Sequence, residues 1–106
     1  MAFKVHRIHN YNYSFDATIG GPGRLQLWGA PGKVAEVSFV DDTSPIPAPV
    51  ISADLNSATI FFRRSVLSGL IDMLRNERPV SVTINDQSPG FVFLHTGLEP
   101  AGEGES

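Results

Sequence analysis

The sequence predicts one small α+β domain, an antiparallel sheet of about five to seven short strands with one amphipathic helix before the last hairpin. Three observations predict this class. Apolar and polar residues alternate over several short stretches, which is the period of a half-buried strand. One stretch, 65–77, instead repeats apolar residues at helical spacing. Ten Gly and eight Pro among 106 residues favour many short elements joined by turns over a helical bundle.

The first strand is expected over residues 3–15, where apolar and aromatic residues share one parity and polar residues the other. Ile8 is an apolar residue at one of the positions that are otherwise polar in this alternation, which indicates a break in this strand. The run Gly20-Gly21-Pro22-Gly23 comes next. It predicts a loop, because glycine is conformationally permissive and proline lacks a backbone donor.

Two hairpins are expected further along the chain. Residues 24–28 and 33–40 alternate around four turn residues, and residues 80–85 and 91–96 alternate around a second turn. Between the hairpins, proline occupies every second position from Pro45 to Pro49, so this segment should run extended over the surface. A short edge strand is expected at 50–51 and a further strand at 58–62.

The helix is expected from about Ser65 to Glu77, with Ser65 as N-cap and Pro79 as the stop signal. Gly69 lies inside it at a cost of about 1 kcal/mol relative to Ala, which suggests a close backbone approach at that position. The apolar stripe is predicted to face the sheet, and it consists of Val66, Leu67, Leu70, Ile71 and Leu74.

The charge of the chain is unevenly placed. The net charge is −3, and Glu99, Glu103 and Glu105 account for all of it. The rest of the chain carries eight basic and eight acidic side chains, so it exerts no long-range attraction on phosphate backbones or anionic membranes. We therefore divide the chain into a domain, residues 1–97, and an acidic flexible tail, residues 98–106.

Composition also bears on location and on cofactors. The chain has no Cys, which excludes disulfides, cysteine-ligated metals and thiol nucleophiles. Charged residues interrupt the N-terminal apolar run, and no stretch reaches the roughly 20 apolar residues of a membrane span, so a cytoplasmic location without membrane contact is expected.

The motifs that carry chemistry are weak. The glycine run is followed by a predicted strand and not by a helix, so it does not fit a phosphate loop. His6 and His9 should point to opposite faces of a strand, and His95 is expected to be a hydrogen-bonded strand residue, so no metal site is predicted. No nucleophile elbow or Ser-x-x-Lys motif occurs. We predict no catalytic residue and no cofactor, and the chain is interpreted as a binding protein more readily than as an enzyme.

The candidate contact residues are aromatic and basic: Tyr11, Tyr13, Trp28, Arg63 and Arg64. Such residues can anchor a protein interface, and short strands leave edges that pair symmetrically, so a homodimer is the preferred hypothesis. The same residues could stack single-stranded nucleic acid, although the neutral body disfavours that partner. A small-molecule site between helix and sheet is the third alternative.

The C-terminal part carries one resemblance. The run from Leu70 to Val80 (LIDMLRNERPV), together with the Glu-Pro-Ala-Gly-Glu-Gly-Glu sequence at 99–105, resembles a group of small uncharacterised bacterial proteins that share this helix end and this terminus. The resemblance implies no activity. On physical grounds, Asp72 and Arg75 are spaced to pair on the helix. A functional role for this helix end would require Arg75 or Asn76 to line a concave pocket.

Overall fold

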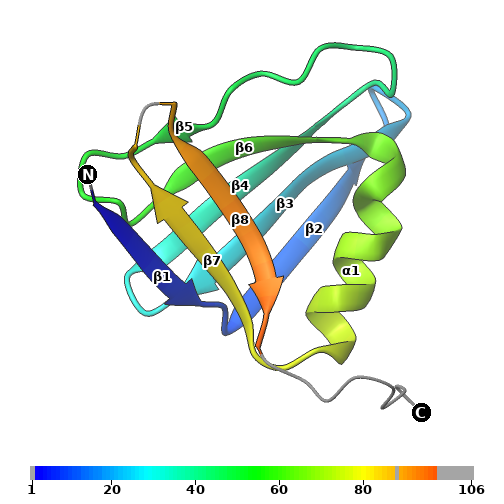
Figure 1. The fold of residues 1–106 in the computed structure, drawn as a ribbon. Coiled ribbons are helices and arrows are strands. Elements are labelled where there is room, and N and C mark those ends of the chain that lie inside the picture. Colours follow the sequence, from blue (N-terminus) through cyan, green and yellow to red (C-terminus); the bar gives the residue numbers. More distant parts are fainter. Residues whose placement is uncertain (1, 88, 98–106) are drawn as a thin grey trace.

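The computed structural model describes residues 2–87 and 89–97 (Figure 1). In this part the chain forms eight strands, one 3-10 turn and one α-helix. Their bounds in chain order are β1 Phe3–Arg7, β2 Asn10–Asp16, β3 Gly21–Gly29, β4 Gly32–Val40, β5 Val50–Ile51, β6 Ala58–Arg63, η1 Arg64–Val66, α1 Leu67–Asn76, β7 Val80–Asn85 and β8 Phe91–Thr96. The predicted α+β class and the helix before the last hairpin are confirmed. The predicted flexible tail lies outside the described residues.

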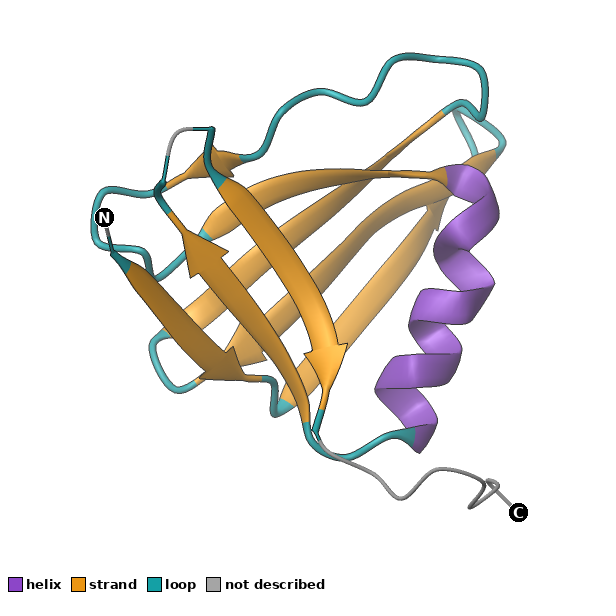
Figure 2. Ribbon diagram, in the orientation of Figure 1, coloured by secondary structure: helices purple, strands orange, loops and turns teal. Residues whose placement is uncertain are grey.

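The strands form two sheets and not one (Figure 2). The small sheet has the order β1-β7-β8, and the large sheet has the order β2-β3-β4-β6-β5. Both predicted hairpins are present, as β3 with β4 and β7 with β8. β6 runs parallel to β4, because the proline-rich segment carries the chain back across the molecule between them. Sequence periodicity shows which residues share a face, but it does not show which strands pair.

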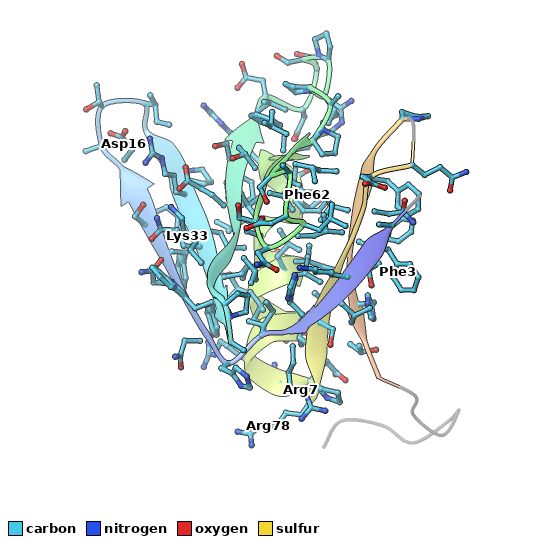
Figure 3. All side chains as sticks on the ribbon, turned by 90° about the vertical axis from the view of Figure 1, so that its left-hand side faces the viewer. Phe3, Arg7, Asp16, Lys33, Phe62 and Arg78 are labelled. Atoms are coloured by element: carbon cyan, nitrogen blue, oxygen red, sulfur yellow. The ribbon has the colours of Figure 1, made fainter. Side chains whose placement is uncertain are left out.

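The two sheets meet where β1 passes into β2. The N–H of Ile8 donates to the carbonyl of Val80 in the small sheet at 2.8 Å, and the next N–H, of His9, donates to the carbonyl of Trp28 in the large sheet at 2.8 Å. The predicted break at Ile8 is therefore the point where the chain changes sheets. Figure 3 looks at this corner, from which the two sheets diverge in a V.

The core fills the space between the sheets. Inward-facing residues of both sheets are buried, and the largest fully buried side chains are Leu25, Leu27, Val34, Val37, Val82 and Ile84. Leu67, Leu70 and Leu74 of α1 pack against this cluster but stay half-buried. No polar or charged residue among the described residues is buried in it. Burial of apolar area from two sheets and one helix face is what stabilises this domain without disulfides.

The helix differs from the expectation in three details. It begins at Leu67 after the 3-10 turn, and Ser65 does not cap it. Its N-cap is Val66, whose side chain is 38 % exposed. A Cβ atom at Gly69 would meet nothing within 4 Å, so the expected close backbone approach there is wrong. Ile71 is the one helix residue that is buried, and α1 stands beside the two sheets and not across the face of one (Figure 1).

The glycine run is not the expected loop, since β3 begins at Gly21. β2 shifts register between Tyr13 and Phe15, and Pro22 lies opposite Phe15 just past this bulge. A Cβ atom at Gly23 would lie 2.7 Å from the hydroxyl oxygen of Ser14. Glycine and proline are tolerated in this strand because they lie at its beginning, beside a bulge, before its pairing with β4 starts.

Candidate functional site

The predicted contact residues lie on different surfaces. Tyr11 and Tyr13 lie opposite Leu27 and Leu25, so they share the inner face of the large sheet. Trp28 lies opposite Asn10 on the outer face. Along β4, Trp28 pairs with Lys33 and Arg63 with Val40, a separation of about 23 Å at 3.3 Å per residue. The structure therefore brings the two tyrosines together but separates them from Trp28 and Arg63.

Arg63 and Arg64 hold the segment that begins with Asp41. The guanidinium group of Arg63 donates to the carbonyl oxygens of Asp41, Asp42 and Ser44. Arg64 forms an ion pair with Asp41 at 3.4 Å and lies against Gly21. These two arginines fasten a long surface connection to the large sheet through Nη1 of each, while Nε of Arg64 is buried without a hydrogen-bond partner among the described residues.

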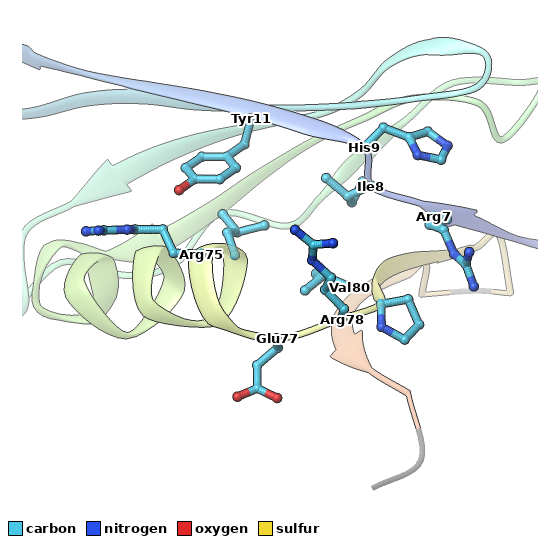
Figure 4. Close-up of a pocket in the computed structure, with 10 residues that line it drawn as sticks. Arg7, Ile8, His9, Tyr11, Arg75, Glu77, Arg78 and Val80 are labelled. Carbon is cyan, nitrogen blue, oxygen red and sulfur yellow. The ribbon is translucent and has the colours of Figure 1, made fainter. Parts of the chain in front are cut away.

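A pocket of about 740 Å³ lies at the corner between the sheets, beside the C-terminal end of α1 (Figure 4). We call it the arginine pocket. Three elements build it: the β1–β2 corner, the last turn of α1 and the segment that leads into β7. Its lining residues are Arg7, Ile8, His9, Tyr11, Leu74, Arg75, Glu77, Arg78, Pro79 and Val80.

The three arginines of this pocket come from two distant parts of the chain. Arg7 ends β1, Arg75 lies in the last turn of α1, and Arg78 comes after the helix. These residues are exposed, and their side chains form no ion pair or hydrogen bond within the described part of the chain. The helix C-terminus favours the two cations beside it. Three arginines and one glutamate give the pocket a formal charge of +2 with His9 neutral.

The centre of the pocket is lined by apolar side chains and arginines. Arg78 extends toward Ile8, and Arg75 extends beneath Tyr11, whereas Glu77 points away from both (Figure 4). The carboxylate of Asp72, which was expected to pair with Arg75, instead accepts a hydrogen bond from the amide nitrogen of Asn76 at 2.7 Å. Arg75 therefore remains available to the pocket.

A second hollow of about 370 Å³ continues from the arginine pocket between β2 and α1, and the two share Arg75. We call this hollow the β2–α1 groove. Its walls are the aromatic residues of β2 and one face of the helix, and the lining residues are Tyr13, Phe15, Leu67, Ser68, Ile71, Asp72, Arg75 and Asn76. β2 is an edge strand of the large sheet. An edge strand presents backbone donors and acceptors that another chain can pair with.

A separate apolar surface covers the outer face of the small sheet. Phe3 is 63 % exposed, Val5 53 % and Phe93 57 %. The register places Phe3 and Val5 in one row and Phe91 and Phe93 in another, with the smaller outward residues of β7 between them. Phe3 points away from the large sheet in Figure 3. We call this surface the aromatic face.

The remaining motifs have structural partners. Nε2 of His6 shares a hydrogen bond with the carbonyl oxygen of Leu55 at 2.8 Å, and His95 hydrogen-bonds the hydroxyl of Thr83 at 2.8 Å. Over residues 2–87 and 89–97, no group of three or more His, Cys, Asp or Glu comes together as a metal site. Nor does the described part contain a helix with the length and apolar character needed to cross a membrane.

Sequence reasoning missed two of the pocket arginines, Arg7 and Arg78, because 71 positions separate them and no motif links them. Arg75 carried a usable signal, since it lies at the charged helix end and lines a concave site. Comparisons with protein-family models, with curated proteins and with solved structures found no match to this chain. The arginine pocket, its adjoining groove and the aromatic face are therefore the features from which a function must be argued.

Proposed function

We propose that this protein is a non-enzymatic binding module that holds an extended, carboxylate-rich segment of a partner protein in the arginine pocket and the β2–α1 groove. The observation that carries the proposal is that Arg7, Arg75 and Arg78 line one pocket and form no ion pair within the described part of the chain. The proposal keeps the cytoplasmic location that the sequence predicts and the bacterial origin that the resemblance implies.

Guanidinium groups suit a carboxylate partner. Arginine presents a planar set of donors that binds a carboxylate through two parallel hydrogen bonds, and it remains charged at any physiological pH. Several arginines around one pocket can bind successive carboxylates of one segment. The pocket also contains Ile8, Leu74 and Val80, so a ligand with apolar side chains beside its carboxylates would bury area there.

The groove next to the pocket suits an extended chain. β2 ends the large sheet on this side, and the helix stands opposite it. A segment that adds to β2 would gain main-chain hydrogen bonds along the strand, and alternate side chains would contact Tyr13 and Ile71 in the groove. A compact ligand would use the pocket alone and would leave the edge of β2 unpaired.

The test uses two eight-residue peptides, one alternating Glu and Val and one in which Gln replaces every Glu. We expect the acidic peptide to bind and to shift the backbone amide signals of β2 in nuclear magnetic resonance spectra. The Gln peptide should bind about tenfold more weakly, since it lacks the charged partners. The double variant Arg75→Gln/Arg78→Gln should lose about the same factor.

Arg24→Gln is the matched control, because Arg24 is exposed on the outer face of the large sheet, away from the pocket. Equal binding of both peptides, or an equal loss in the Arg24 variant, would contradict the proposal. Tighter binding of an eight-nucleotide oligothymidylate than of the acidic peptide at low salt would favour the nucleic-acid alternative instead.

A second proposal, self-association, rests on the aromatic face. Its two apolar rows flank the polar residues Asn85 and Thr83, and the rows themselves contain no acidic residue. Two copies related by a two-fold axis could place an apolar row of one copy against the outward residues of β7 in the other. This is the self-complementary arrangement of a symmetric dimer. This proposal is independent of the arginine pocket, because the two surfaces differ.

A further inference from the structure

We infer that the chain's own acidic segment, residues 98–106, occupies the arginine pocket when no partner is bound, and that a partner must displace it. This inference rests on the proposed function, since it assigns an internal competitor to the same site. Three observations carry it: the place where the described chain ends, the charge of residues 98–106, and the length of that segment.

The described chain ends at the rim of the pocket. The N–H of Gly97 donates to the carbonyl oxygen of Pro79 at 3.2 Å, and a Cβ atom at Gly97 would lie 3.0 Å from Cδ of Pro79. Pro79 lines the pocket between Arg78 and Val80. In Figure 3, Arg7 and Arg78 both lie at this closed end of the V. Residue 98 must therefore start within one residue length of the pocket wall.

The charge of the segment is opposite to that of the pocket. Residues 98–106 contain Glu99, Glu103 and Glu105 and no Lys or Arg. The pocket has a formal charge of +2. Elsewhere in the chain acidic and basic side chains are equal in number, so the excess negative charge of the whole chain lies in the segment that begins beside this positive pocket.

The segment is long enough to reach the arginines. Glu99 lies two residues beyond Gly97, which span about 7 Å when extended, and all nine residues span up to about 30 Å. A short tether holds its end at an effective concentration on the order of 1 mM near an adjacent site. A segment whose dissociation constant as a free peptide is about 1 mM would therefore fill the pocket half of the time.

The physical consequence is that a partner must displace the segment before it can occupy the pocket. The segment and a partner compete for the same arginines, so the apparent affinity of the partner falls in proportion to the fraction of pocket that stays free. Added salt should weaken both interactions, because exposed charges are screened over about 8 Å at physiological ionic strength.

The experiment compares the full chain with the full-length variant Glu99→Gln/Glu103→Gln/Glu105→Gln. The probe is the synthetic peptide Leu-Glu-Pro-Ala-Gly-Glu-Gly-Glu-Ser, which repeats residues 98–106, titrated in nuclear magnetic resonance experiments. We expect the variant to bind this peptide about two- to tenfold more tightly than the unaltered chain, because its own segment no longer competes. Adding Arg78→Gln should abolish that binding, and adding Arg24→Gln should not.

The outcomes separate this inference from the proposed function. Equal, arginine-dependent binding by both chains would overturn the inference and leave the proposed function standing. Failure of both chains to bind this peptide and the Glu-Val peptide would overturn both proposals. A molecular mass that rises with concentration for the unaltered chain but not for the Gln variant would assign the segment to the pocket of a second copy, which overturns the intramolecular assignment.

Discussion

Gly29 lies directly against the backbone of Arg7: a Cβ atom at Gly29 would lie 2.6 Å from the carbonyl oxygen of Arg7. Gly29 ends β3 in the large sheet, and Arg7 ends β1 in the small sheet. This close approach lies at the corner where the chain passes between the sheets. It also determines where Arg7 stands at the arginine pocket, so the fold and the candidate site depend on the same contact.

Gly29→Ala should therefore destabilise the protein by about 1–3 kcal/mol, as overpacking of a close contact does. The free energy of unfolding, measured by urea denaturation, checks this prediction. A change of less than about 0.5 kcal/mol, which is typical of an uncrowded surface position, would show that the corner can open without cost.

Gly69→Ala should have the opposite sign, and it serves as the control for Gly29. Nothing lies within 4 Å of the Cβ position, and the residue is inside α1. Replacing an exposed helical glycine by alanine removes its entropic penalty, so we expect a gain of about 0.5–1 kcal/mol in the free energy of unfolding. A loss of stability would mean that this side of the helix is covered in solution.

The helix stripe should contribute unequally to stability. Ile71 is 9 % exposed and belongs to the core cluster, whereas Val66 is 38 % exposed. Ile71→Ala should cost roughly 2–5 kcal/mol, as for a buried isoleucine. Val66→Ala should change the free energy of unfolding by about 0.5 kcal/mol or less, as at an exposed position. Comparable losses at both positions, measured by urea denaturation, would contradict this exposure pattern.

Acid should weaken the fold partly through Glu36. The hydrogen bond from Lys33 at 2.8 Å is the main cause that holds the pKa of Glu36 below its ordinary value of 4.5, with smaller contributions from Gln26 and Arg24. Because the pKa is lower in the folded state, the stabilisation is present above pH 4.5 and is lost as the pH falls through the folded pKa. The carboxyl of Asp54, bonded by Ser52 and the N–H of Asn56, has its pKa shifted in the same direction.

Urea denaturation from acid to pH values above 4.5 checks this. Glu36→Gln should be less stable than the unaltered chain above pH 4.5, and the difference should shrink below that pH. Lys33→Gln should reduce the pH dependence in the same way, since it removes the main partner of Glu36. A difference that grows toward low pH would reverse the sign argued for Glu36.

Self-association should depend on the aromatic face. If this surface joins two copies, light scattering over a hundredfold dilution will show a mass that falls toward that of the monomer. Phe93→Ser should lower the mass at every concentration, because Phe93 is exposed and contributes to one of the apolar rows. Val50→Ser is the matched control, since Val50 is 64 % exposed on the other sheet. A monomeric mass at all concentrations would remove this proposal.

The sequence by itself determined the local elements of this protein. Alternation over 80–85 and 91–96 predicted a hairpin, and it is present because side chains on a strand alternate between faces whatever their neighbours are. The apolar Ile8, at a position that is otherwise polar in the alternation, predicted the break at which the chain changes sheets. The helix was predicted from its stripe, although its first turn is 3-10 and its cap differs.

The tertiary structure alone decided the pairing of strands and the site. Whether β6 lies parallel to β4, and whether there are one or two sheets, depends on packing between segments far apart in sequence. The arginine pocket has the same origin, since the sheet corner and not any motif brings Arg7 and Arg78 to one pocket. Local periodicity reflects the geometry of one element, whereas a site built from several elements depends on how those elements pack together.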